Sequence, residues 1–139
     1  MSSFTSPLVI SPLPDGRKWR LFCQFGYDVG KKGSGDRITV PAGFVTDFAS
    51  SPRPIWFIIP PWGKYGKAAI IHDYLYQFLK WMLEQPQYKP LFDHFDYART
   101  NPRKFADDIF REAMEVLGVE MWRIFLMYWG VRLFGWLAW

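Results

Sequence analysis

The segment of residues 68–76 constrains the fold most, because it has to bury one face of a helix that carries an ionisable pair. It reads Ala-Ala-Ile-Ile-His-Asp-Tyr-Leu-Tyr, so His72 and Asp73 directly follow four apolar residues, and Tyr76 comes one helical turn later. Imidazole titrates near neutral pH, and a half-buried histidine beside a carboxylate is therefore a candidate general base or metal ligand. We expect any chemistry of this protein at this segment.

The second half of the chain has the pattern of packed helices. The spacing of apolar residues predicts a first helix over residues 67–83, followed by a polar segment over residues 84–100. Asn101, followed by a proline, is typical of a helix start and predicts a second helix over residues 102–117. A last and strongly aromatic helix is predicted over residues 120–139.

The first half has the pattern of short strands. Apolar and polar side chains alternate over most of residues 18–25, which is the period of a half-buried strand. Short apolar runs at residues 8–10, 38–40 and 43–49 predict further strands. A loop rich in proline, glycine and aromatic residues, residues 51–66, then separates the strands from the helices.

These elements predict a single α+β domain over residues 1–139, with a small antiparallel sheet in the N-terminal half packed with three C-terminal helices. It comprises a strand-rich part (1–50), the aromatic loop (51–66) and a helical part (67–139). Half of the residues are hydrophobic and a fifth are aromatic, with eight tryptophans, which is more aromatic than a core needs. We therefore expect some rings at an interface with a partner, a membrane or a ligand.

Composition and charge exclude several classes of protein. The net charge of +4 comes without a long basic run, and no basic helix or aromatic-basic groove motif indicates nucleic acid. Cys23 is the only cysteine, which excludes an intrachain disulfide and a cysteine-rich metal site. The N-terminus lacks the basic start and apolar run of a secretory signal peptide, so we expect synthesis and folding in a reducing cytoplasm.

The C-terminal helix approaches the length of a membrane span but contains two arginines. Because Arg123 and Arg132 interrupt the apolar run, we expect no transmembrane span. The structural interpretation is a helix packed in the domain with protruding tryptophans. The functional alternative is a helix that contacts a lipid surface.

Two adjacent aspartates on the second predicted helix have different expected environments. At about 100° per residue, Asp107 falls at the edge of the apolar arc and Asp108 falls on the solvated side. A buried carboxylate is costly unless it is paired. Since His72 and Tyr76 share one face of the first helix, we expect either or both of them to satisfy Asp107, with Asp73 turned about 100° away and available to hold a cation.

The arrangement His72-Asp73-x-x-Tyr76 with a distant Asp107 on an antiparallel helix resembles the phospholipase A2 superfamily. The segment of residues 106–110 also looks like the second-helix motif of its viral members. This resemblance implies that His72 activates a water molecule and that Asp107 and Tyr76 fix the histidine. It also implies that Asp73 binds Ca²⁺, which stabilises the oxyanion. The implied activity is hydrolysis of an acyl ester, with a lipid as the expected substrate and a lipid or bacterial envelope surface as the expected partner.

A second resemblance covers nearly the whole chain. The runs at residues 40–50, 60–63, 72–76, 106–114 and 128–135 look like an uncharacterised family of phage and prophage proteins, catalogued as a domain of unknown function. It implies a phage origin, with synthesis in the host cytoplasm and association with the virion. The rival to an enzyme is therefore a non-catalytic phage structural or tail-associated protein that binds other virion proteins, with a buried polar cluster at His72.

Other candidate site residues have alternatives of their own. Asp47 is either a third acidic metal ligand or a residue that caps its own backbone turn. Ser50 and Ser51 lack the Gly-x-Ser-x-Gly context of a serine hydrolase. His94 is interpreted as a loop residue rather than a ligand, and two histidines with one distant cysteine do not favour structural zinc.

Overall fold

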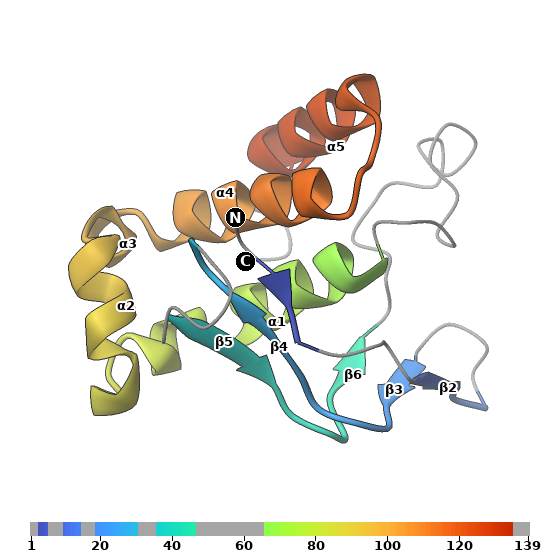
Figure 1. Ribbon diagram of the computed structural model, residues 1–139, viewed down its shortest axis with the longest axis horizontal. Coiled ribbons are helices and arrows are strands. Elements are labelled where there is room, and N and C mark those ends of the chain that lie inside the picture. Colours follow the sequence, from blue (N-terminus) through green and yellow to red (C-terminus); the bar gives the residue numbers. More distant parts are fainter. Residues whose placement is uncertain (1–2, 6–9, 15–18, 31–35, 47–65, 135–139) are drawn as a thin grey trace.

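The computed structural model describes residues 3–5, 10–14, 19–30, 36–46 and 66–134 (Figure 1). Within these residues the strands precede the helices along the chain, as the sequence predicts. The α+β class is confirmed, with antiparallel pairing in the N-terminal half and helices that follow it.

The first sheet has the order β1-β4-β5 and is antiparallel throughout. It consists of β1 (Ser3–Phe4), β4 (Phe25–Asp28) and β5 (Arg37–Val40), with Tyr27 opposite Ile38 in the central register. All four residues of β4 are buried, because this strand is central in the sheet and is covered by helices. The predicted strand at residues 38–40 is confirmed as part of β5.

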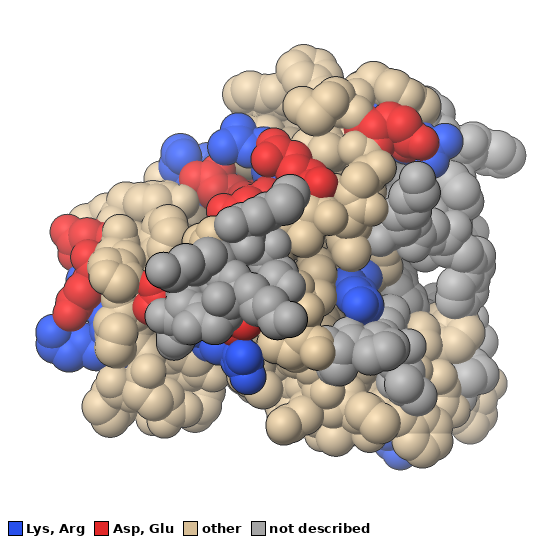
Figure 2. All heavy atoms as spheres, in the orientation of Figure 1, with Lys and Arg blue, Asp and Glu red and all other residues tan. Residues whose placement is uncertain are grey.

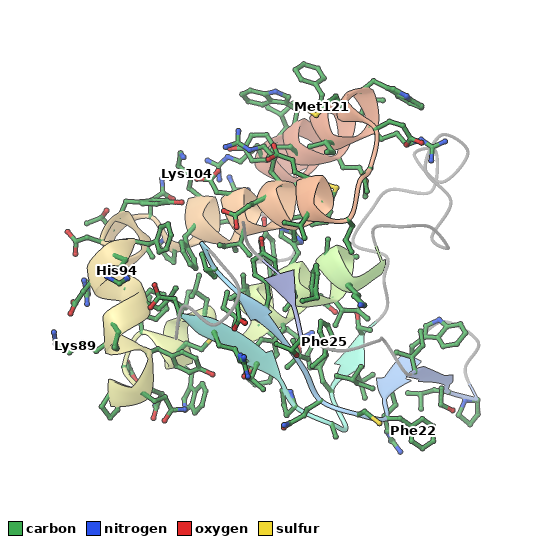
Figure 3. All side chains as sticks on the ribbon, viewed as in Figure 1. Phe22, Phe25, Lys89, His94, Lys104 and Met121 are labelled. Atoms are coloured by element: carbon green, nitrogen blue, oxygen red, sulfur yellow. The ribbon has the colours of Figure 1, made fainter. Side chains whose placement is uncertain are left out.

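The second sheet has the order β2-β3-β6, and it corrects the predicted strand over residues 18–25. It consists of β2 (Ile10–Pro12), β3 (Trp19–Leu21) and β6 (Val45–Thr46). The chain bends at Phe22, so the predicted strand is divided between β3 in this sheet and β4 in the other. Phe22 breaks the alternation in the sequence, and its side chain is 65% exposed and projects from the end of the molecule opposite α5 (Figure 3).

The three predicted helices are present as α1 (Gly66–Met82), α4 (Pro102–Val116) and α5 (Met121–Phe134). The polar segment between the first two adds short helices to the three that were predicted. It contains a 3₁₀ helix, η2 (Pro86–Tyr88), and two short helices, α2 (Lys89–His94) and α3 (Tyr97–Thr100). Its prolines lie at the first turn of η2 and of α2, where proline starts a helix rather than breaking it.

α1, α4 and α5 stack in successive layers, with α5 farthest from the first sheet (Figure 1). α1 contacts β5 and β6, α4 packs on α1, and α5 packs on the far side of α4. The buried apolar residues form one core cluster that draws on both sheets and on α1, α2, α4 and α5. Tyr27 ties the sheet to α4, because its hydroxyl donates a hydrogen bond of 2.6 Å to Oε1 of Glu112.

This layering makes a direct prediction for two leucines. Leu75 on α1 is fully buried, so Leu75→Ala is expected to lower the free energy of unfolding by about 3 kcal/mol through lost contacts and a residual cavity. Leu126→Ala on the exposed side of α5 removes the same atoms and is expected to change it by less than about 0.5 kcal/mol. Urea unfolding of both variants measures the difference, and equal costs would contradict the layer order.

Candidate functional site

α1 brings His72 and Tyr76 to the side of the helix that meets α4. Ile71 and Leu75 lie fully buried beside them, so the local sequence turns this face inward. The His72 side chain is 6% exposed, and Tyr76 packs partly buried against the core cluster. The helical spacing of four residues sets their rings 4.2 Å apart between centroids.

Asp107 on α4 lies opposite these two side chains and is fully buried. Nε2 of His72 is 2.8 Å from Oδ1 of Asp107, and the Tyr76 hydroxyl donates a hydrogen bond of 2.6 Å to the same oxygen. The contact expected from the sequence is therefore present, and it involves both His72 and Tyr76. Asp107, rather than Asp108, is the aspartate that meets α1.

Two arginines occupy the other side of the Asp107 carboxylate. Nη1 of Arg132 on α5 donates a hydrogen bond of 2.9 Å to Oδ2, and Nη1 of Arg103, one turn before Asp107, is 3.6 Å from the same oxygen. Arg103 also donates to the carbonyl oxygens of Val131 and Arg132, at 2.9 and 3.0 Å. These carbonyls lie in the last described turn of α5, so Arg103 ties that turn to α4.

Sequence reasoning missed both arginines. Arg132 was interpreted only as an interruption of an apolar helix. The signal for its role was the buried carboxylate itself, since a buried charge is retained only when it is paired. We name the set of His72, Tyr76, Arg103, Asp107 and Arg132 the Asp107 cluster; it joins α1, α4 and α5.

The cluster fixes the protonation of its tyrosine and the orientation of its imidazole. Burial, and then the hydrogen bond to Asp107, raise the pKa of Tyr76 well above its usual range, so its hydroxyl stays a donor. The His72 ring stacks on Phe110 at 4.6 Å with an interplanar angle of 30°. We assign the ring proton to Nε2, because a carboxylate held by two guanidinium groups accepts hydrogen bonds. Within the described residues, no hydrogen bond reaches the other nitrogen, Nδ1.

Asp73 lies apart from the Asp107 cluster. It is partly buried on α1 and accepts a hydrogen bond of 3.2 Å from Nε2 of Gln77. Asp47, the other predicted metal ligand, lies outside the described residues together with Ser50 and Ser51. In the part of the chain that the structure describes, no group of three or more histidine, cysteine or acidic side chains is arranged to hold a metal ion. Of the two acidic ligands expected for Ca²⁺, the described residues therefore include Asp73 alone.

Asp108 was predicted to be a surface charge, and the structure shows it partly buried, with its side chain 16% exposed. The Tyr97 hydroxyl donates to its Oδ2 at 2.8 Å and the Tyr128 hydroxyl donates to its Oδ1 at 2.7 Å. Lys104 adds a hydrogen bond and ion pair of 2.8 Å. Burial pushes the pKa of Asp108 up, but these three hydrogen bonds together lower it below its ordinary value. The pattern of one helix could not reveal these partners, because the tyrosines come from α3 and α5.

The described surface also contains a hollow beside Asp108. It has a volume of about 230 Å³ and runs along α3 and α4. Its lining residues are Phe95, Tyr97, Asp108, Ile109, Arg111, Glu112 and Glu115. Among the predicted catalytic and metal residues that the structure describes, none lines this hollow, so it is a feature separate from the Asp107 cluster.

His94 was interpreted as a loop residue, and the structure corrects this. It is the last residue of α2, and its exposed ring lies with Nδ1 2.7 Å from Oδ2 of Asp36. His94 therefore links α2 to Asp36, the residue before β5, and has no contact with the Asp107 cluster.

The pairing of Asp107 with Arg132 predicts a measurable coupling. Arg132→Met is expected to lower the free energy of unfolding by about 3 kcal/mol, because it removes a counter-charge from a buried carboxylate. In an Asp107→Asn background the same change is expected to cost at least about 1 kcal/mol less. Urea unfolding of the four proteins measures the coupling. Arg123→Met, on the same helix but paired with Glu120, is the control that should show none.

The hydrogen bonds to Asp108 predict a pH effect. Because its pKa is lowered, Asp108 stabilises the fold above the ordinary carboxylate pKa of about 4, and this contribution is lost as the pH falls through the lowered value. Tyr128→Phe removes one of the hydrogen bonds and should raise the pKa of Asp108 toward its ordinary value. An NMR titration of its carboxyl carbon measures the shift. Tyr74→Phe, which alters a ring packed on Phe44 and Phe78, should leave it unchanged.

Comparison with known proteins gives a family without an assigned activity. No curated protein and no solved structure matches the chain significantly. Residues 19–131 match the family described as "Protein of unknown function (DUF1353)". The match includes every residue of the Asp107 cluster except Arg132, which lies one position beyond its end. Because the match spans most of the chain, this protein belongs to the DUF1353 family.

Proposed function

We propose that this protein is a hydrolase of acyl esters in which His72 activates a water molecule. The observation that carries the proposal is the contact between Nε2 of His72 and the Asp107 carboxylate. The Tyr76 hydroxyl donates a hydrogen bond to the same carboxylate. A histidine whose one nitrogen is held by a carboxylate has its tautomer and orientation fixed, and its other nitrogen can act as a base. The resemblance to phospholipase A2 assigns the same roles to these three residues.

The proposed reaction uses Nδ1 of His72 to take a proton from water. The water oxygen then attacks the ester carbonyl carbon, and Asp107 stabilises the imidazolium that forms. The histidine returns its proton to the leaving alcohol oxygen as the carbon–oxygen bond breaks. Arg132 and Arg103 do not contact His72. They position it indirectly, because they pair with the Asp107 carboxylate that orients its ring.

Calcium and lipid belong to the same proposal. Asp73 follows the proposed base directly and is the candidate Ca²⁺ ligand in the described residues. A bound calcium ion would supply stabilisation of negative charge on the carbonyl oxygen. A lipid ester is the substrate that the resemblance favours, and it is tested together with the calcium requirement.

The second candidate is a non-catalytic phage structural or virion-associated protein. The observation that favours it is the burial of the Asp107 cluster, in which the His72 side chain is 6% exposed and Asp107 has no exposed surface. On this alternative the cluster holds three helices together and His72 has no chemical role. Phage origin and synthesis in a host cytoplasm are part of the proposal and rest on the sequence resemblance.

Hydrolysis of phospholipid vesicles by matched histidine variants tests the proposal. His72→Asn should lower the rate about a hundredfold or more, because it removes the base. His94→Asn changes the other, exposed histidine and should retain wild-type activity. Asp73→Asn and removal of calcium by a chelator should both lower the rate if Asp73 holds the ion.

Two outcomes would reject the enzyme. One is a wild-type protein that hydrolyses no phospholipid or simple acyl ester with calcium present, and the other is equal activity of the two histidine variants. In either case, copurification of the protein with phage particles would favour the virion-associated alternative, and His72→Asn would then change only the stability of the fold.

A further inference from the structure

The outward side of α5 carries a continuous band of large apolar side chains, which we name the outer α5 stripe. At about 100° per residue its members fall within an arc of about 140°. All of them are exposed, and Figure 2 shows the outer surface of α5 as largely uncharged, with Met121 at one end of the helix in Figure 3. The stripe consists of Met121, Trp122, Phe125, Leu126, Trp129 and Leu133.

The fold does not allow α5 to bury this stripe. The opposite side of the helix already packs on α4 through Ile124, Met127 and Tyr128, which are all buried. The last turn is held by Arg132 on Asp107 and by Arg103 on the α5 carbonyls. Turning the helix would break the pairing of a buried carboxylate. An apolar surface of this extent indicates an interaction site.

We propose that the outer α5 stripe docks on the surface of a lipid bilayer that contains anionic lipids. Trp122 and Trp129 are the residues that lie best at the boundary between headgroups and acyl chains, with Phe125 inserted between them. α5 has two arginines and no acidic residue. The guanidinium of Arg123 stacks on Trp122 at 5.1 Å, which places a cation beside an indole where headgroup phosphates lie.

The helix lies along the bilayer rather than across it. In the described part of the chain, no helix is long and apolar enough to cross a membrane. Oε2 of Glu120, just before α5, is 3.3 Å from Nε of Arg123, and this ion pair partly offsets the charge of the arginine. Apolar contact by the stripe therefore supplies most of the binding, and anionic lipid adds to it.

Charge favours a bilayer over a second copy of this chain. Two copies that each carry a net charge of +4 repel each other, whereas anionic headgroups attract the chain. Arg123 lies beside the stripe with its side chain 34% exposed, whereas Arg132 is turned toward Asp107.

Flotation with phosphatidylcholine vesicles, with and without phosphatidylglycerol, tests the inference by binding alone. The full chain should float with both and more strongly with the anionic vesicles. Trp129→Ala should weaken binding roughly tenfold, because it removes one aromatic side chain from the contact. Trp81→Ala on α1 is the matched control, because both tryptophans are 47% exposed, and it should bind like the wild type.

Three results would overturn the inference: no flotation of the wild type, an equal loss in Trp81→Ala, or a lipid-free dimer that Trp129→Ala dissociates. The last would assign the stripe to a second copy. Circular dichroism should give the same helix content for both variants. His72→Asn should float like the wild type, so binding without hydrolysis would keep this inference while rejecting the proposed enzyme.

Discussion

The charge of Asp107 is the constraint on which the helical half of this protein depends. A carboxylate without exposed surface would be strongly destabilising on its own, and its partners come from each helix around it. His72 and Tyr76 come from α1, Arg103 from the same helix, and Arg132 from α5. Satisfying this single group sets the register of α1 against α4 and holds α5 against α4.

The same pairing links stability to the proposed chemistry. A general base needs a fixed ring, and the ring of His72 is fixed by contacts that also hold the helices together. A structural cluster and a catalytic one therefore share most of their geometry, and they differ in whether Nδ1 of His72 meets water and substrate. Asp108, the next residue, shows that pairing alone does not define a site, because its tyrosine and lysine partners provide no base.

The sequence pattern predicted the elements whose secondary structure depends on their own residues alone. The helices at α1, α4 and α5 follow from apolar spacing and from the proline after Asn101. The sequence pattern was misleading or silent where packing against another part of the fold determines the structure. The alternation over residues 18–25 does not mark one strand, because the chain bends at Phe22 and passes from one sheet to the other. The polar segment after α1 forms short helices, because Leu91 and Phe92 find an apolar surface that exists only in the folded protein.

The sequence by itself determined which aspartate turns inward. Helical periodicity puts Asp107 on the apolar arc, and it puts His72 and Tyr76 on one face, since both are properties of a single helix. Only the tertiary structure decided what completes the pairing. Arg132 lies 25 residues from Asp107 along the chain, and the Asp108 tyrosines come from two other helices. No period within one element encodes such contacts, because they depend on how three helices pack and on the need to neutralise a buried charge.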